Sequence, residues 1–173
     1  VFQHRRGYAF EVVVTATQRG KPVYAAVGTY LARTGHSATG LPAWEERDMT
    51  LPDDTSELTP IQASGGLIRH YARVSGDYNP IHLSQVTAKL FGFKRAIAHG
   101  MWTAARVISD LQASRQLSGQ EIDIQFKRPL FLPGKAKAVV GLTSENTSFS
   151  VLSEGTASEP TVYMCGTLRS PAG

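Results

Sequence analysis

The pattern of apolar and polar residues divides the chain into strand-rich ends and a helical middle. Residues 8–17 alternate between the two faces of an extended chain, and residues 23–33 do so again after a turn at Gly20. This period of two predicts an antiparallel hairpin. Residues 121–126, 135–143, 147–153 and 161–168 show a similar pattern and predict four further strands.

The middle of the chain has helical spacing instead. Residues 63–74 predict one helix, and residues 81–91 predict another, with Leu83, Val86, Leu90 and Phe91 facing inward. The longest apolar run, about residues 97–114, is apolar around most of its circumference, which is typical of a buried helix. One buried helix followed by four antiparallel strands is an α+β layout.

Composition narrows the function classes. The chain has 173 residues, of which 42% are hydrophobic, so it can bury a sizeable core. Its net charge of +4 includes no Lys/Arg run of the kind found at nucleic-acid surfaces, and no apolar run reaches membrane-spanning length. The charge suits a polyanionic ligand such as coenzyme A, although solubility explains it equally well. Cys165 is the single cysteine, which indicates a reducing, cytoplasmic location.

The candidate chemistry lies in residues 71–82, which read Tyr-Ala-Arg-Val-Ser-Gly-Asp-Tyr-Asn-Pro-Ile-His. Proline disfavours helical backbone at Asn79, so a new helix is expected to begin at Pro80 with Asn79 as its N-cap. This corner folds Asp77 and His82 towards each other, where a carboxylate and an imidazole can hold one water and move its protons. Taken alone, each residue is more simply explained as a helix cap or a packed side chain.

The whole stretch resembles the signature of the MaoC-like (R)-specific enoyl-CoA hydratases. That signature is Ser-Gly-Asp, any residue, Asn-Pro, an aliphatic residue and His, preceded by Tyr-Ala, and the chain matches it without a gap. Residues 91–101, with Phe-Gly-Phe and Ala-His-Gly-Met, are also similar to the family. The resemblance covers about residues 45–170. It implies the hotdog fold, a curved antiparallel sheet wrapped around a long central helix.

The resemblance also implies an activity. It is the reversible (R)-specific hydration of trans-2-enoyl-CoA, or dehydration of an (R)-3-hydroxyacyl thioester, in fatty acid metabolism. Asp77 would act as general base on the water, with His82 as its partner in positioning and proton delivery. The backbone N–H of Gly100 would be the oxyanion donor, unless Gly100 only permits close packing. No metal or other cofactor is implied, and the acyl group would be carried on coenzyme A or acyl carrier protein.

Supporting roles and competing functions stay open. Asn79 either orients the catalytic pair or caps a helix, and Ser75 and Gly76 are expected to shape the corner. His99 is expected to be a buried, hydrogen-bonded residue rather than a metal ligand. The alternatives are a hotdog protein that binds acyl thioesters without turnover, and a hotdog thioesterase. Hotdog thioesterases place their acid on the central helix, where residues 98–114 offer only Asp110.

The first hairpin needs a separate explanation, because a lone hairpin is marginal in water. We expect residues 1–34 to be the remnant of a preceding, degenerate hotdog domain, residues 35–44 a linker, and residues 45–173 the MaoC-like domain. The hairpin would then pair with a second hotdog unit, or with another copy in a homodimer, and the chain would be a fragment of a longer protein. Alternatively, the chain is complete and its hairpin extends its own sheet.

Overall fold

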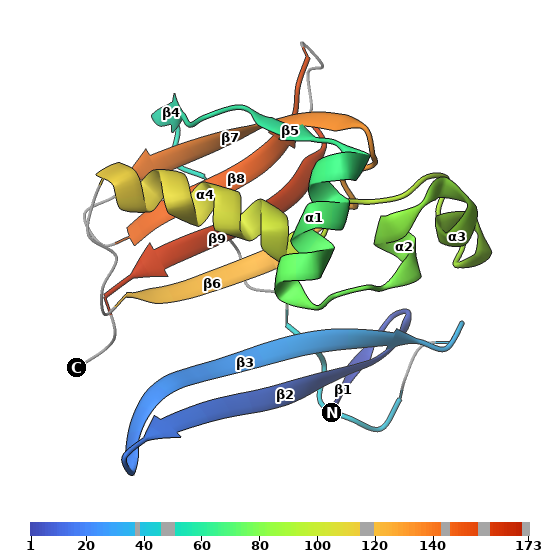
Figure 1. Cartoon of the computed structure of the whole chain (residues 1–173). Helices are drawn as coiled ribbons and strands as arrows, with labels where there is room; N and C mark the ends of the chain where they lie inside the picture. Colours follow the sequence, from blue (N-terminus) through green and yellow to red (C-terminus); the bar gives the residue numbers. More distant parts are fainter. Residues whose placement is uncertain (37–38, 46–50, 115–119, 143–145, 156–159, 171–173) are drawn as a thin grey trace. The chain divides into compact units, whose positions relative to one another are not determined.

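The computed structural model describes residues 1–36, 39–45, 51–114, 120–142, 146–155 and 160–170. The chain forms two compact units, Val1–Asp48 and Met49–Gly173. The first unit contains a three-stranded antiparallel sheet in the order β1 (Phe2–His4), β2 (Gly7–Gln18) and β3 (Lys21–Arg33) (Figure 1).

The long pair β2 and β3 confirms the predicted hairpin. Its register runs from Gly7 opposite Arg33 to Gln18 opposite Lys21, and the turn uses positive φ at both Arg19 and Gly20. Half or more of the surface of six of its large apolar side chains is exposed, namely Val13, Val14, Val23, Tyr24, Val27 and Tyr30. The origin of residues 1–34 as a domain remnant, and the linker role of residues 35–44, stay predictions.

The second unit has a six-stranded antiparallel sheet. Its strands are β4 (Thr55–Glu57), β5 (Ile61–Ala63), β6 (Glu121–Phe126), β7 (Gly134–Leu142), β8 (Asn146–Ser153) and β9 (Val162–Arg169). The order is β4-β7-β8-β9-β6, and β5 also pairs with β7. Strands β6 to β9 match the four predicted strands within one or two residues, and Cys165 lies buried in β9. Strands β4 and β5 were not predicted, because three residues are too few to show an alternating pattern.

The helices are α1 (Gly65–Ser75), α2 (Pro80–Leu83), α3 (Gln85–Leu90) and α4 (Gly100–Ser114). The prediction of one helix over residues 81–91 is wrong. Ser84 adopts extended backbone, with φ −151° and ψ 161°, and its side chain accepts a hydrogen bond from the Thr87 N–H at the start of α3. The predicted inward packing is also wrong for Val86, Leu90 and Phe91, which are exposed.

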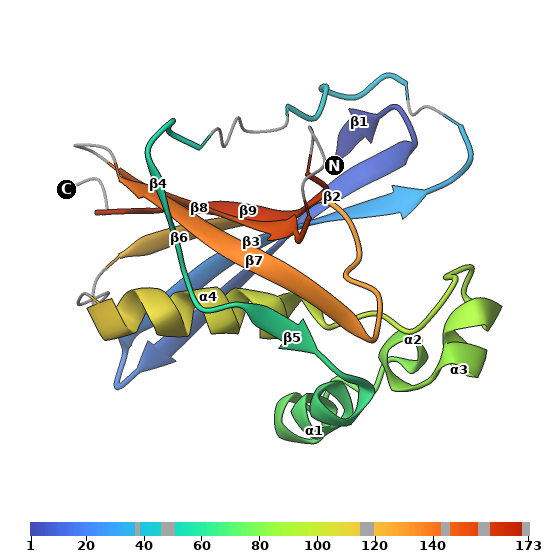
Figure 2. The same cartoon turned by 90° about the horizontal axis from the view of Figure 1, so that it is seen from above.

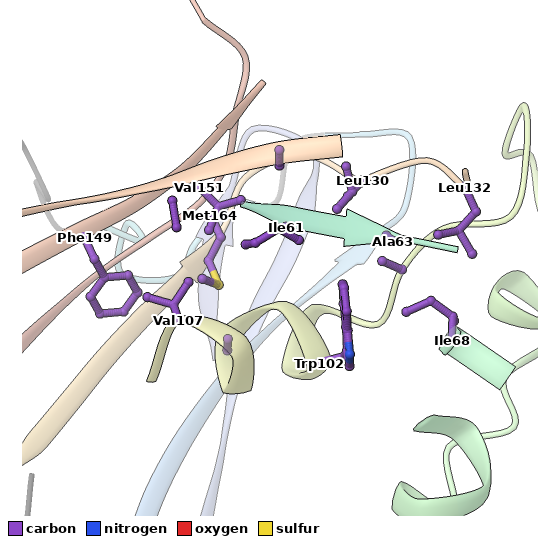
Figure 3. Close-up of a cluster of buried hydrophobic side chains, with 14 of the residues drawn as sticks. Ile61, Ala63, Ile68, Trp102, Val107, Leu130, Leu132, Phe149, Val151 and Met164 are labelled. Carbon is purple, nitrogen blue, oxygen red and sulfur yellow. The ribbon is translucent and has the colours of Figure 1, made fainter. Parts of the chain in front are cut away.

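Helix α4 lies along one face of the six-stranded sheet (Figures 1 and 2). Val107 of α4 packs in a buried cluster with Phe149, Val151 and Met164 from the sheet (Figure 3). This arrangement confirms the α+β layout. The helix is not buried all round, because Met101 is 59% exposed.

The start of α4 is set by the segment before it. The Ala98 N–H donates to the Leu130 carbonyl at 2.8 Å, and the Leu132 N–H donates to the Ala96 carbonyl at 2.8 Å. These bonds keep residues 96–98 extended, so the helix begins at Gly100 rather than near residue 97. Among the described residues, no helix is long and apolar enough to cross a bilayer. The cytoplasmic location stays a prediction.

Alanine substitutions at Gly166 and Gly66 should change the free energy of unfolding in opposite directions, which tests the packing. A Cβ at Gly166 in β9 would lie 2.3 Å from the Phe149 ring and 2.5 Å from the Asp123 carbonyl oxygen. Gly166→Ala should therefore reduce the free energy of unfolding by about 1–3 kcal/mol, as overpacking does. A Cβ at Gly66 in α1 would meet nothing within 4 Å, so Gly66→Ala should be stabilising by about 0.5–1 kcal/mol. Urea unfolding measures both, and equal effects would contradict this packing.

Candidate active site

A tight backbone corner follows α1. Gly76 caps the helix with a φ of 75°, and its N–H donates to the Ala72 carbonyl at 3.0 Å. Glycine adopts this left-handed conformation without steric cost. The Ser75 hydroxyl donates to the Tyr71 carbonyl at 2.9 Å and accepts from the Asp77 N–H at 3.2 Å. Ser75 and Gly76 thus lie where they were expected, shaping the turn that delivers Asp77.

One oxygen of the Asp77 carboxylate accepts a local hydrogen bond, and the other lies 3.9 Å from His82 Nε2 and 3.7 Å from His99 Nε2. Its Oδ1 accepts a hydrogen bond from the Asn79 N–H at 3.2 Å. The Asn79 side chain points onward, where its Oδ1 accepts from the Ile81 N–H at 3.3 Å as the N-cap of α2. The two open roles of Asn79 are therefore combined in one residue: its side chain caps the helix, and its backbone orients the carboxylate.

His82 faces the other oxygen of Asp77. Its Nδ1 lies 2.9 Å from the Ile97 carbonyl oxygen, which can only accept, so Nδ1 carries the hydrogen. In the neutral ring, Nε2 is then an unprotonated acceptor. It lies 3.9 Å from Asp77 Oδ2. Burial lowers the pKa of His82 from its usual 6.5, and His99 lowers it further, against the hydrogen bond to Ile97 and the charge of Asp77. The site therefore favours neutral His82.

His99 contacts both Asp77 and His82. Its ring stacks on His82 with centroids 3.7 Å apart, and its Nε2–H donates to the Asp77 backbone carbonyl at 2.9 Å. His99 is buried, and its Nδ1 has no hydrogen-bond partner among the described residues. Leaving a buried polar atom unpaired lowers stability, so a role of His99 in the site explains this arrangement better than packing of the hydrophobic core does.

Asp77, His82 and His99 also form a group of possible metal ligands, with ligand atoms within 4.8 Å of one another. Metal ions bind imidazole nitrogens through lone pairs in the ring plane. The two rings are only 26° from parallel, so these lone pairs do not converge on one point. The Nε2 of His99 is moreover engaged as a donor to Asp77. The geometry fits a hydrogen-bonded cluster better than a metal centre.

Gly100 begins α4 beside the same cluster. The first hydrogen bond of the helix runs from the Thr103 N–H to the His99 carbonyl, so none of the described residues accepts from the Gly100 N–H. This free N–H lies at the positive end of the helix dipole, where an anionic oxygen is stabilised. A Cβ at this position would lie 2.8 Å from the Phe126 ring. This close contact with the Phe126 ring explains the glycine at position 100, whereas any residue other than proline would supply the N–H.

These groups line one cavity of about 620 Å³. Asp77, His82 and His99 contribute to its wall together with Gly100 and Ser75. Asn79 does not line it, and neither does Tyr78, which is exposed. The remaining lining is largely apolar: Tyr71, Phe93, Ile97, Ala98, Met101, Thr103, Phe126, Lys127, Arg128, Pro129, Leu130, Tyr163 and Met164.

Sequence reasoning missed most of this lining. The lining residues Phe126, Tyr163 and Met164 come from β6 and β9. Their strands were predicted, but the pairing that brings β6 beside β9 was not. Thr103 carried a usable signal, because it lies three residues after Gly100 and so on the same face of the helix.

Comparisons with known proteins identify the family of the chain. Residues 49–161 match the family described as MaoC like domain. The chain belongs to the MaoC-like family. A curated relative, "3-hydroxyacyl-thioester dehydratase X" of Mycobacterium tuberculosis, is 34% identical over 137 residues. That match covers 78% of the chain and 47% of the relative, so the chain spans about half of its length.

Solved structures show the same MaoC-like fold. The crystal structure of HtdX from Mycobacterium tuberculosis matches with a TM-score of 0.75 and 28% identity, covering 98% of this chain and 64% of that one. The (R)-hydratase from A. caviae matches with a TM-score of 0.50 and 23% identity, covering 68% of this chain and 95% of that one. Together they confirm the expected hotdog fold.

The depressed pKa of His82 predicts a pH dependence of stability. The unfolded chain takes up a proton on this histidine as the pH falls below 6.5, whereas the folded protein resists it. The free energy of unfolding should therefore fall with pH below 6.5, and should fall less in His82→Gln. Urea unfolding of both proteins between about pH 7.5 and pH 5.5 measures the difference. The same pH dependence in both would contradict the burial of a neutral His82.

Proposed function

We propose that the protein is a lyase that reversibly hydrates trans-2-enoyl thioesters and dehydrates (R)-3-hydroxyacyl thioesters. One observation carries the proposal: Asp77 Oδ2 and His82 Nε2 lie 3.9 Å apart on the wall of a largely apolar cavity, next to the free N–H of Gly100. The dehydratase name of the curated relative supports the same reaction class.

The positions of the two acceptors, Asp77 Oδ2 and His82 Nε2, define the proposed water site. An ionised carboxylate and an unprotonated Nε2 repel each other unless a donor lies between them. At 3.9 Å, one water can lie within about 2.8 Å of both atoms and donate one hydrogen to each. Its lone pairs then point away from both groups and into the cavity. This orientation suits attack on the β-carbon of a bound enoyl thioester.

The proton then passes through the pair. In hydration, the water oxygen bonds to Cβ while Asp77 takes one of its protons, and the double-bond electrons move to Cα and the thioester oxygen. The Asp77–His82 pair afterwards gives a proton to Cα, so that one water has been added overall. His82 Nε2 accepts the second hydrogen of the water while the oxygen attacks, and the two coupled groups then share the proton that goes to Cα. Dehydration is the reverse sequence.

The Gly100 N–H is the proposed donor to the thioester oxygen. Negative charge develops on this oxygen as the C–O bond to the β-carbon forms. A fixed N–H at a helix N-terminus stabilises such charge without reorganising during the reaction. The cavity wall of Phe93, Phe126 and Met164 then suits the acyl chain.

The thioesterase alternative lacks such support. Asp110 lies in α4 but forms an ion pair with Arg106 at 3.6 Å and does not line the cavity. A protein that binds acyl thioesters without turnover would not require Asp77 and His82 to be positioned around one water.

We also propose that the hairpin of β2 and β3 pairs with a second hotdog unit. Its exposed apolar side chains and the greater length of the relatives support this proposal.

Asp77→Asn tests the general base. The amide keeps the shape of the carboxylate but cannot accept a proton from water, so hydration of crotonyl-CoA should fall about 10²–10⁴-fold. Thermal unfolding should show that the fold is kept, since the Asn side-chain oxygen still accepts from the Asn79 N–H. Turnover at the wild-type rate would contradict the mechanism.

Gly100 is tested by a pair of variants that differ in one N–H. Alanine at this position would contact the Phe126 ring, so both variants are made in a Phe126→Leu background. Proline is tolerated at the first position of a helix but has no N–H. Gly100→Pro should therefore lower kcat about 10²–10³-fold relative to Gly100→Ala. Equal, mild losses in two folded variants would assign Gly100 to packing alone.

A further inference from the structure

The helical segment that leads to the cavity has a net positive charge because it contains few acidic residues. Between residues 58 and 109 the sequence has one acidic residue, Asp77, and six basic ones: Arg69, Arg73, Lys89, Lys94, Arg95 and Arg106. This segment has a net charge of +5, whereas the whole chain has a net charge of +4. The remainder of the chain is thus slightly negative, and the segment attracts anionic partners.

The same segment exposes large apolar side chains. Val86, Leu90 and Phe91 are 73%, 81% and 59% exposed. Val86 and Leu90 are four residues apart in α3, so they lie on one face of the helix, and Phe91 follows directly. We call these three residues, with Lys89, Lys94 and Arg95, the α3 face. Clustered exposed apolar residues with a polar rim mark an interaction surface.

The α3 face is joined to the cavity by a short, fixed loop. The Phe93 N–H donates to the Ala88 carbonyl of α3 at 3.1 Å, and Phe93 lines the cavity. Further along this loop, Ile97 lines the cavity and holds the His82 ring. A partner on the α3 face would therefore bind next to a loop that forms part of the cavity wall. Helices α2 and α3 extend beyond the end of the sheet, where such a partner could approach (Figures 1 and 2).

We propose that the α3 face binds an acidic acyl carrier protein, which presents the acyl thioester to the cavity. This inference rests on the proposed function and adds the carrier of its substrate. A carrier protein with acidic side chains around an apolar contact complements both features of the face. The phosphates of coenzyme A would complement the basic residues of the face but not its three exposed apolar side chains. A second copy of the chain would bring two faces of the same charge together, which is repulsive.

The decisive experiment compares three carriers of one acyl group. Hydration is measured with crotonyl-acyl carrier protein, crotonyl-CoA and the uncharged crotonyl-N-acetylcysteamine. The test variant is Lys89→Glu/Lys94→Glu, and Lys21→Glu/Lys135→Glu has the same net charge with the changes outside the α3 face. For the carrier-protein substrate, kcat/KM should fall about tenfold or more in the test variant at low salt. The other two substrates, and the control variant, should stay within about twofold.

Two outcomes in this assay would overturn the proposal. An equal loss with crotonyl-CoA would show that the lysines bind a phosphate that both carriers share. No loss with the carrier-protein substrate would show that the face is not its docking site. Leu90→Ser tests the apolar part of the face separately, and should raise KM for the carrier-protein substrate while leaving kcat unchanged.

Binding without turnover separates this inference from the proposed function. Titration of the wild-type protein into labelled acyl carrier protein should give a salt-sensitive binding isotherm, which Lys89→Glu/Lys94→Glu weakens about tenfold. Binding without any hydratase activity would refute the proposed function but keep the docking site. Absence of binding would overturn the docking site. So would co-sedimentation with anionic phospholipid vesicles in place of carrier binding, because it would assign the face to a membrane surface.

Discussion

The site depends on the backbone corner between α1 and α2, which fixes one oxygen of the Asp77 carboxylate and leaves the other facing the imidazoles of His82 and His99. Three local hydrogen bonds build this corner, from Gly76 to Ala72, from Asp77 to Ser75 and from Asn79 to Asp77. Each spans only two to four residues, so the sequence itself encodes the geometry. The corner also allows two side chains five residues apart to meet, which a continuous helix would prevent.

The rest of the site is assembled by contacts that are distant in sequence. His82 is oriented by the Ile97 carbonyl, and residues 96–98 are kept extended by their pairing with residues 130–132. The same pairing starts α4 at Gly100, which leaves its N–H free beside the imidazoles. His99 joins the two parts, because it stacks on His82 and donates to the Asp77 backbone. The proposed catalytic pair and the proposed oxyanion donor are therefore held by one network.

The sequence predicted what is local and missed what depends on tertiary packing. The Asn79–Pro80 corner, the cap of α2 and strands β6 to β9 follow from backbone preferences and period-two patterns. The inward packing of Val86 and Leu90 was wrong, because Ser84 breaks the helix and rotates α3 away from the core. The stack of His99 on His82 and the contact of Phe126 with Gly100 join residues 17 and 26 positions apart, which no local pattern reveals.

The central claim is that one water, held between Asp77 and His82, supplies both the hydroxyl at Cβ and, through the pair, the proton at Cα. Because one pair of groups on one wall of the cavity handles both, oxygen and hydrogen should add to the same face of the double bond. Hydration of crotonyl-CoA in D₂O, followed by proton NMR of the 3-hydroxybutyryl product, measures this directly. The account predicts syn addition with (R) configuration at Cβ. Anti addition would require a separate proton donor on the opposite wall and would contradict it.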